Sequence, residues 1–109
     1  MRRLWMPLYI GEYLADTGHL TTLQHGAYFL LIMHYWATGG LPTTDRELRT
    51  IVGMSEEEWF NNCSTIAKFF TRDWHHNRID EEIYNAEKII AARSLAGKAS
   101  AASRRKRRE

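Results

Sequence analysis

The sequence lacks the features that several common classes of protein need. Cys63 is the only cysteine among 109 residues, which excludes an intramolecular disulfide and fits a reducing compartment. The longest apolar run, residues 27–33, is far shorter than the ~20 residues that cross a bilayer. Pro7, Glu12 and Asp16 interrupt the stretch after the basic N-terminus, so no signal peptide is expected. We therefore expect a soluble, cytoplasmic, single-domain protein.

No pattern typical of a catalytic or metal centre is present either. His75 and His76 are adjacent, so on a strand they would face opposite ways and could not chelate one ion. His19, His25 and His34 have no cysteine pair and no HExxH arrangement near them. We expect no metal, no cofactor and no small-molecule substrate. A chain this short has little room for an active-site cleft, so a binding protein is expected and not an enzyme.

Charge is distributed very unevenly along the chain. The formal net charge is +2, yet residues 98–109 hold six basic residues against one acidic residue, a net +5. Residues 1–97 therefore carry a net −3. The apolar pattern stops near Arg93, and the sequence then turns to Ala, Ser, Gly and basic residues. We expect a folded domain over residues 1–93 and a basic, disordered tail over residues 94–109.

Capping chemistry marks the expected helix starts. A hydroxyl followed three residues later by an acid or amide satisfies two orphan backbone donors reciprocally, and this pattern occurs three times. The three boxes pair Thr21 with Gln24, Thr44 with Glu47, and Ser55 with Glu58. Asp80 is expected to cap a fourth helix, with Ile79 and Tyr84 as its hydrophobic staple.

The expected helices pack around one another as follows. Residues 22–37 are apolar on nearly every side, which predicts the buried centre of a bundle. Residues 45–52 form a short helix that ends at Gly53, a residue suited to a left-handed C-cap. The next helix runs to about residue 69, and its inward stripe is Trp59, Cys63, Ile66 and Phe70. Two helices joined by so tight a turn predict a helix-turn-helix.

The region after this helix pair is expected to form a short β-hairpin. Residues 69–71 and 74–79 are rich in aromatic side chains, as strands prefer, and they flank Arg72 and Asp73. A last helix would then start at Asp80. The fold class expected from this order is mainly α with a small β-hairpin, that is, a winged-helix domain followed by a C-terminal helix and the basic tail. Ile79, Ile83 and Ile90 lie on one face of that helix, too few to decide the oligomeric state.

Two stretches of the chain resemble a known family. Residues 5–17 read WMPLYIGEYLADT and are followed by HL at 19–20 and HGAY at 25–28. Later come FF at 69–70, WH at 74–75, NR at 77–78 and IDEEI at 79–83. Together they resemble the YdaU-like family of prophage proteins. The resemblance implies a bacterial or phage setting and a winged-helix-like domain placed at the front of replication-initiation-like phage proteins. It supplies no catalytic residues. The hairpin loop is shorter than the family's usual one, and the chain stops after the basic tail, as in a short or truncated member.

Candidate contacts to nucleic acid lie on three parts of the chain. On the second helix of the helix-turn-helix, base reading would fall to outward polar residues, since Asn pairs with adenine and Thr and Lys reach bases or phosphates. Arginines on the preceding helix, with basic residues of the hairpin, could hold phosphates. The tail would bind polyanions without sequence preference. In chain order the residues are Arg46, Arg49, Asn61, Asn62, Thr65, Lys68, Arg72, His75, Arg78, Arg104, Arg105, Lys106, Arg107 and Arg108.

Two functions remain open at this level. The first is a DNA-binding winged-helix module of a phage or prophage, serving replication initiation or its regulation, with salt-sensitive binding to duplex DNA driven by the tail. The second is an adaptor whose acidic, aromatic-rich domain engages a host or phage protein such as a helicase, a loader or a defence complex. Glu56, Glu57 and Glu58 would oppose a phosphate backbone, although capping and the helix dipole also account for them.

Overall fold

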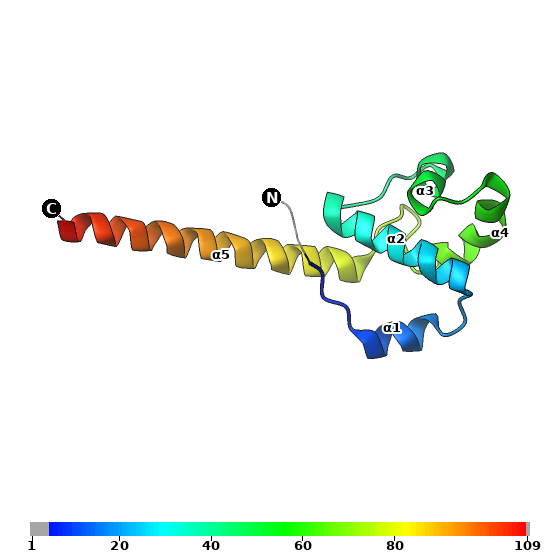
Figure 1. Cartoon of the computed structure of the whole chain (residues 1–109), viewed down its shortest axis with the longest axis horizontal. Coiled ribbons are helices and arrows are strands. Elements are labelled where there is room, and N and C mark those ends of the chain that lie inside the picture. The colour runs from blue at the N-terminus through cyan, green and yellow to red at the C-terminus, as the bar shows by residue number, and fades with distance from the viewer. Residues whose placement is uncertain (1–4, 109) are drawn as a thin grey trace.

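The computed structural model describes the backbone of residues 5–108 and the side chains of residues 5–97. Five helices follow one another: α1 (Ile10–Thr17), α2 (Thr22–Thr38), α3 (Asp45–Val52), α4 (Glu56–Ala67) and α5 (Asn77–Arg108). The first four form a body at one end, and α5 extends from it as one long helix (Figure 1). The radius of gyration is 19.1 Å, whereas about 13 Å is usual for a compact chain of this length.

The helix starts follow the capping chemistry closely. Full capping boxes form at Thr21 with Gln24 and at Ser55 with Glu58, as the sequence predicts. At Thr44 only half of the box is present, because the hydroxyl accepts from the Glu47 N–H without the reciprocal bond. Gly53 ends α3 with φ +68°, the expected left-handed C-cap. The turn between α3 and α4 is therefore confirmed.

Helix α2 has two buried faces, and each builds one half of the core. Ala27 and Leu31 pack with the α3–α4 pair, where Leu48, Trp59 and Ile66 are buried. The Trp59 indole N–H donates to Asp45 Oδ1 at 3.1 Å and ties α4 to the start of α3. The expected inward stripe of α4 is confirmed, because Cys63 and Phe70 also pack against this cluster.

The second face of α2 holds the start of α5. Tyr28, Ile32, Tyr35 and Trp36 are buried together with Ile79, and other side chains of α1 and α5 pack around them. The expectation that α2 is covered on every side is wrong, because Leu23, Leu30 and Met33 are exposed. Their side of α2 lies outside both core clusters, so the helix is central to the body without being fully enclosed.

The predicted β-hairpin and winged-helix wing are wrong. Within residues 5–108 the structure has no strand, and residues 68–76 form an irregular connection between α4 and α5. Two backbone hydrogen bonds join the two arms that were expected to pair: the Thr71 N–H donates to the His75 carbonyl at 2.8 Å, and the Trp74 N–H donates to the Thr71 carbonyl at 3.0 Å. Trp74 adopts a left-handed φ of +61°, which breaks the extended backbone that a strand needs.

The aromatic side chains explain why strands do not form there. Phe69 stacks on Tyr28 at 4.6 Å between ring centroids, while Phe70 contacts Trp74 at 5.4 Å. Trp74 also lies 6.0 Å from Trp59, so its packing offsets the cost of its backbone conformation. These rings all turn toward the body, whereas strand residues would alternate between two faces.

The last helix also differs from its expected limits at both ends. It begins at Asn77, three residues before the expected cap at Asp80, and the cap is the ring of His76, whose Nδ1 accepts from the Ile79 N–H at 3.3 Å. At the other end the helix continues to Arg108, well past residue 93, where we expected it to fray. Helix-forming Ala, Arg and Lys residues dominate this stretch, and no proline interrupts it. The side chains of residues 98–109 lie outside the described part.

Two glycine substitutions should shift stability in opposite directions. A Cβ at either Gly26 or Gly53 would meet no atom within 4 Å, so sterics do not distinguish them. Gly53→Ala should lower the free energy of unfolding by about 1–2 kcal/mol because its φ is left-handed. Gly26→Ala, inside α2, should raise it by about 0.5–1 kcal/mol because alanine restricts the unfolded chain and favours helix. Urea unfolding followed by circular dichroism measures both; equal shifts would contradict this account of the turn.

Candidate functional site

The residues expected to read DNA on α4 have different environments. Asn62 is half-buried, and both ends of its amide are engaged: Oδ1 accepts from Gln24 Nε2 at 3.0 Å, and Nδ2 donates to the Glu58 carbonyl at 2.7 Å. Thr65 is half-buried, whereas Asn61 and Lys68 are exposed. The four residues therefore do not form one open face, because Asn62 serves the contact between α2 and α4.

The expected phosphate contacts are also divided. Arg46 and Arg72 are exposed, and Arg49 is half-buried. The Nδ1 atom of His75 lies 3.6 Å from the Oδ2 atom of Asp80. Arg78 forms an ion pair with Glu12, and its guanidinium lies over the ring of Tyr9 at 4.4 Å. His75 and Arg78 thus face acidic partners of this chain, and the side chains of Arg104, Arg105, Lys106, Arg107 and Arg108 lie outside the described residues.

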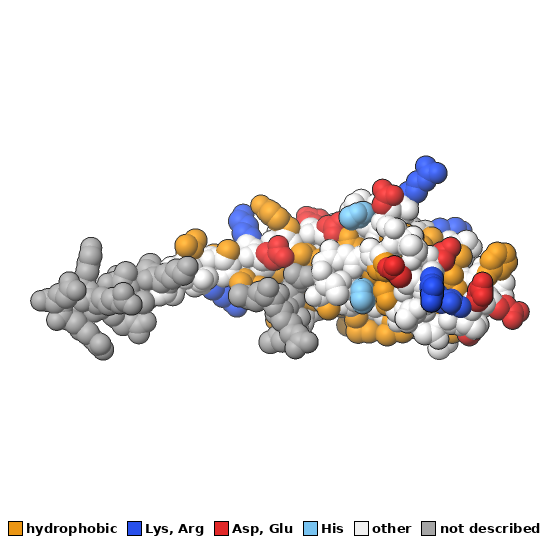
Figure 2. Space-filling model, turned by 90° about the horizontal axis from the view of Figure 1, so that it is seen from above, with side chains coloured by type: hydrophobic (Ala, Val, Ile, Leu, Met, Phe, Trp, Pro, Cys, Tyr) orange, Lys and Arg blue, Asp and Glu red, His pale blue; other side chains and the backbone are white. Residues whose placement is uncertain are grey.

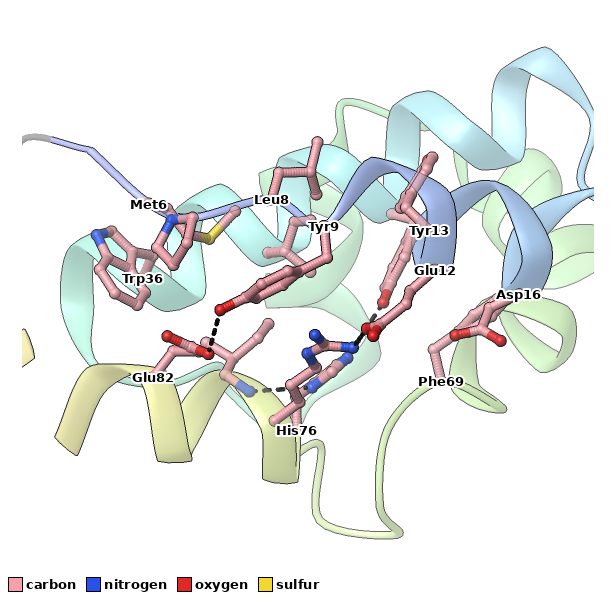
Figure 3. Close-up of a pocket in the computed structure, with 15 residues that line it drawn as sticks. Met6, Leu8, Tyr9, Glu12, Tyr13, Asp16, Trp36, Phe69, His76 and Glu82 are labelled. Carbon is pink, nitrogen blue, oxygen red and sulfur yellow. Dashed lines mark hydrogen bonds and ion pairs between the residues drawn. The ribbon is translucent and has the colours of Figure 1, made fainter. Parts of the chain in front are cut away.

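A cleft of about 510 Å³ opens where the N-terminal segment, α1, α2 and the start of α5 meet. Tyr9, Glu12 and Asp16 reach it from the N-terminal segment and α1, while His76 and Glu82 reach it from the opposite side (Figure 3). Its wall is mostly apolar or aromatic. The remaining lining residues are Met6, Pro7, Leu8, Tyr13, Tyr28, Ile32, Trp36, Phe69, Arg78 and Ile79.

The cleft carries more negative than positive charge. Its carboxylates are Glu12, Asp16 and Glu82. Arg78 is the only Arg or Lys among the lining residues, and it forms an ion pair with Glu12. The Tyr9 hydroxyl donates to Glu82 Oε1 at 3.3 Å. Asp16 makes no hydrogen bond or ion pair with any described residue, and its charge helps raise the pKa of Tyr28. Burial is the first cause of that shift, which takes the Tyr28 pKa to about 12. Tyr28 is therefore a neutral hydroxyl in the floor of the cleft.

A hydrogen-bonded group of tyrosines fixes the base of the cleft. Because His76 Nδ1 accepts from a backbone N–H, its neutral ring carries the proton on Nε2 and donates to Tyr28 Oη at 3.1 Å. The Tyr35 hydroxyl donates to Asp80 Oδ1 and accepts from the His76 N–H at 3.2 Å. Burial, and then the neighbouring Asp80, raise the pKa of Tyr35. Burial lowers the pKa of His76, so the ring stays neutral at neutral pH.

Sequence reasoning did not find this cleft. Aromatic residues at helical spacing usually pack inward, which predicts core positions for residues 5, 9, 13, 28, 35 and 36, and Tyr28, Tyr35 and Trp36 are indeed buried. Tyr9 and Trp5 instead remain exposed, and Trp5 is 77 % exposed. One signal was available, since the resemblance is densest over residues 5–17, which supply seven of the fifteen lining residues. The other lining residues could not be predicted, because the two walls of the cleft come from segments that are far apart in the sequence.

Among the described residues no group of three His, Cys, Asp or Glu side chains is placed to hold a metal ion. No described helix is both long and apolar enough to cross a membrane.

Fold and cleft together define a small domain that has helices and no strands within residues 5–108 and that carries a cleft at the start of its long last helix. The chain belongs to the family described as "Protein of unknown function (DUF1376)", whose pattern matches residues 4–84. It is 40% identical over 108 residues to the "Uncharacterized protein YdaU" of Escherichia coli strain K12. The resemblance to the YdaU-like family is thus confirmed. The match takes in 96% of this chain and 38% of that relative, so the chain spans well under half of its length. No solved structure matches.

The pH dependence of stability should depend on His76. The folded-state pKa of this ring is lowered, so the unfolded chain binds a proton more readily below about pH 6.5. Stability should therefore be full above that pH and fall as the solution is acidified, by at most about 1.4 kcal/mol per pH unit. His76→Asn keeps a capping acceptor without the titration and should flatten the slope between pH 7.5 and 5.5. Thermal unfolding across pH tests this prediction, and a slope that is the same in the variant and the wild-type chain would contradict it.

Asn62 should matter for the fold more than for any partner. Asn62→Ala removes the hydrogen bond from Gln24 across α2 and α4, and it should lower the free energy of unfolding by about 1 kcal/mol. Asn61→Ala changes an exposed neighbour on the same helix and should leave stability within about 0.5 kcal/mol. Neither should alter duplex-DNA affinity measured by fluorescence anisotropy. A loss of DNA affinity in the Asn62 variant alone would contradict this prediction and would indicate that Asn62 contacts a base.

Proposed function

We propose that this chain is a DNA-binding module of phage type that serves replication initiation or its regulation, and that it contacts DNA through the basic end of α5. The observation that supports this is the separation of charge along the molecule. Residues 98–109 carry a net +5 and residues 1–97 a net −3. Figure 2 shows Asp and Glu side chains spread over the body and the first part of α5.

The basic end has the properties of a non-specific phosphate contact. Residues 104–108 are five consecutive cations on the last turns of α5, which rises about 1.5 Å per residue. They match a polyanion whose phosphates are closely spaced along the helix axis. If all five neutralise phosphates, log K should fall with log salt with a slope near −4 to −5 on duplex DNA.

The body supports a different role from base reading. Three glutamates open α4, Asn62 is engaged by Gln24, and Arg78 is paired with Glu12. Each of these features disfavours close approach of a phosphate backbone to this part of the chain. DNA contact would then come from the helix end, and the body would remain available to another molecule.

The second candidate, a protein-binding adaptor, is favoured by the surface of that body. Phe60 on α4 is 80 % exposed, and Leu23, Leu30 and Met33 on α2 are exposed as well. Exposed apolar side chains of this size are typical of protein-binding surfaces. The partner in this proposal is a host or phage protein such as a helicase, a loader or a defence complex.

Neutralising the basic end should separate the two candidates. In the full chain, Arg104, Arg105, Lys106, Arg107 and Arg108 are all changed to glutamine, which keeps helix propensity. Duplex affinity at 50 mM salt should fall by at least ~100-fold, and the salt slope should approach zero. Arg46→Gln with Arg49→Gln is the control, and it should change affinity less than about threefold. Fluorescence anisotropy across salt concentrations measures both. Unchanged binding by the five-glutamine variant would reject the DNA-binding proposal.

A further inference from the structure

The cleft continues into an exposed stripe along α5. Positions 78, 82, 85, 89, 92 and 96 are spaced by four and three residues in turn, so they share one face of the helix. Arg78 and Glu82 at its start line the cleft. Further along, Ile89 is exposed, as are Ala92 and Ala96, and Leu95 beside them is 68 % exposed. The stripe is thus polar where it borders the cleft and apolar and narrow at Ile89, Ala92 and Ala96, whose exposed side chains no described part of this chain covers.

Charge along α5 is ordered from acidic to basic. Residues 77–88 hold Asp80, Glu81, Glu82 and Glu87 against Arg78 and Lys88, a net −2, whereas residues 98–108 hold Lys98 and the five consecutive cations. Two such helices side by side in parallel would place like charges together. In the antiparallel arrangement each acidic start meets a basic end, which is the attractive pairing.

The basic end of α5 is too far from its own cleft to enter it. The helix is continuous, and residues 82 and 106 are separated by about 36 Å of helical rise. The cleft lies at the start of that helix, and Figure 1 shows the basic end pointing away from the body. Only the basic end of another molecule can therefore reach the cleft of a given copy.

The cleft suits a basic side chain. Its three carboxylates exceed its one arginine, and Asp16 has no hydrogen-bonding partner among the described residues. Tyr9 already accepts the Arg78 guanidinium over its ring beside Glu12, so this combination of aromatic ring and carboxylate does accommodate such a group.

We propose that two copies of this chain pair antiparallel along the α5 stripe, with the basic end of each helix at the cleft of the other. A two-fold axis level with Ser94 places Ala92 of one copy opposite Ala96 of the second and brings Glu82 level with Lys106. The pairing is closed, since each copy gives the same helix and the same cleft. It does not depend on DNA binding, but the two use the same cations, so duplex DNA competes with the dimer.

Complementary charge reversal tests this arrangement. The cleft variant carries Asp16→Lys and Glu82→Lys; the basic-end variant carries Arg104→Glu, Lys106→Glu and Arg107→Glu. Sedimentation equilibrium at 50 mM salt should give a dimer for the wild-type chain. Each variant alone should dissociate at least ~10-fold more readily, and an equimolar mixture of the two should recover the dimer because both of its contacts are again attractive. Glu57→Lys, exposed on α4, is the control and should leave the dimer unchanged.

The outcomes distinguish this proposal from its rivals and from the DNA-binding proposal. The basic-end substitutions lie far from the core, so they test the idea even if the cleft variant fails to fold. A wild-type chain that stays monomeric at 200 μM would overturn the proposal. Single variants that dimerise as strongly as the wild-type chain would also overturn it, and they would indicate that the exposed face of α2 forms the dimer. A mixture of the two variants that stays monomeric would overturn it as well. DNA binding is measured separately by anisotropy and can fail while the dimer persists.

Discussion

The attachment of α5 to α2 through Tyr35 and Tyr28 is the interaction on which the architecture depends. Tyr35 is fully buried, and its hydroxyl holds both Asp80 and the His76 backbone, while Tyr28 holds the His76 ring that caps α5. Buried polar groups are stable only when they are satisfied, so these bonds allow few alternatives. They fix where α5 begins and the direction in which it leaves the body.

The position of α5 in turn creates the features that bear on function. Its first turns close the cleft from one side, opposite the N-terminal segment and α1. Its length carries the cations to the far end of a molecule 69 Å long. The acidic body and the basic end therefore act as separate surfaces, and the same separation supports both DNA contact by the end and pairing with a second copy.

Local chemistry in the sequence predicts much of the body. The capping boxes at Thr21 and Ser55 and the left-handed cap at Gly53 involve partners a few residues apart, so they do not depend on the rest of the fold. The aromatic segment after α4 was misjudged for the opposite reason. Its composition suits a strand equally well, but Phe69, Phe70 and Trp74 find their partners on α2 and α4, and that long-range packing decides their backbone. The predicted DNA contacts of Asn62 and Arg78 were misjudged for the same reason, because these side chains bind residues that lie 38 and 66 positions away in the sequence.

The sequence by itself determined the order of α2, α3 and α4, the turn at Gly53, the inward stripe of α4, the uneven charge and the family. These follow from periodicity, composition and contacts within one turn of helix. Only the tertiary structure decided that the wing is absent, that α5 starts at a histidine cap, and that a cleft lies between its start and residues 5–17. The physical reason is that each of these arises where segments distant in sequence compete for the same buried surface of α2, and no local pattern encodes the result of that competition.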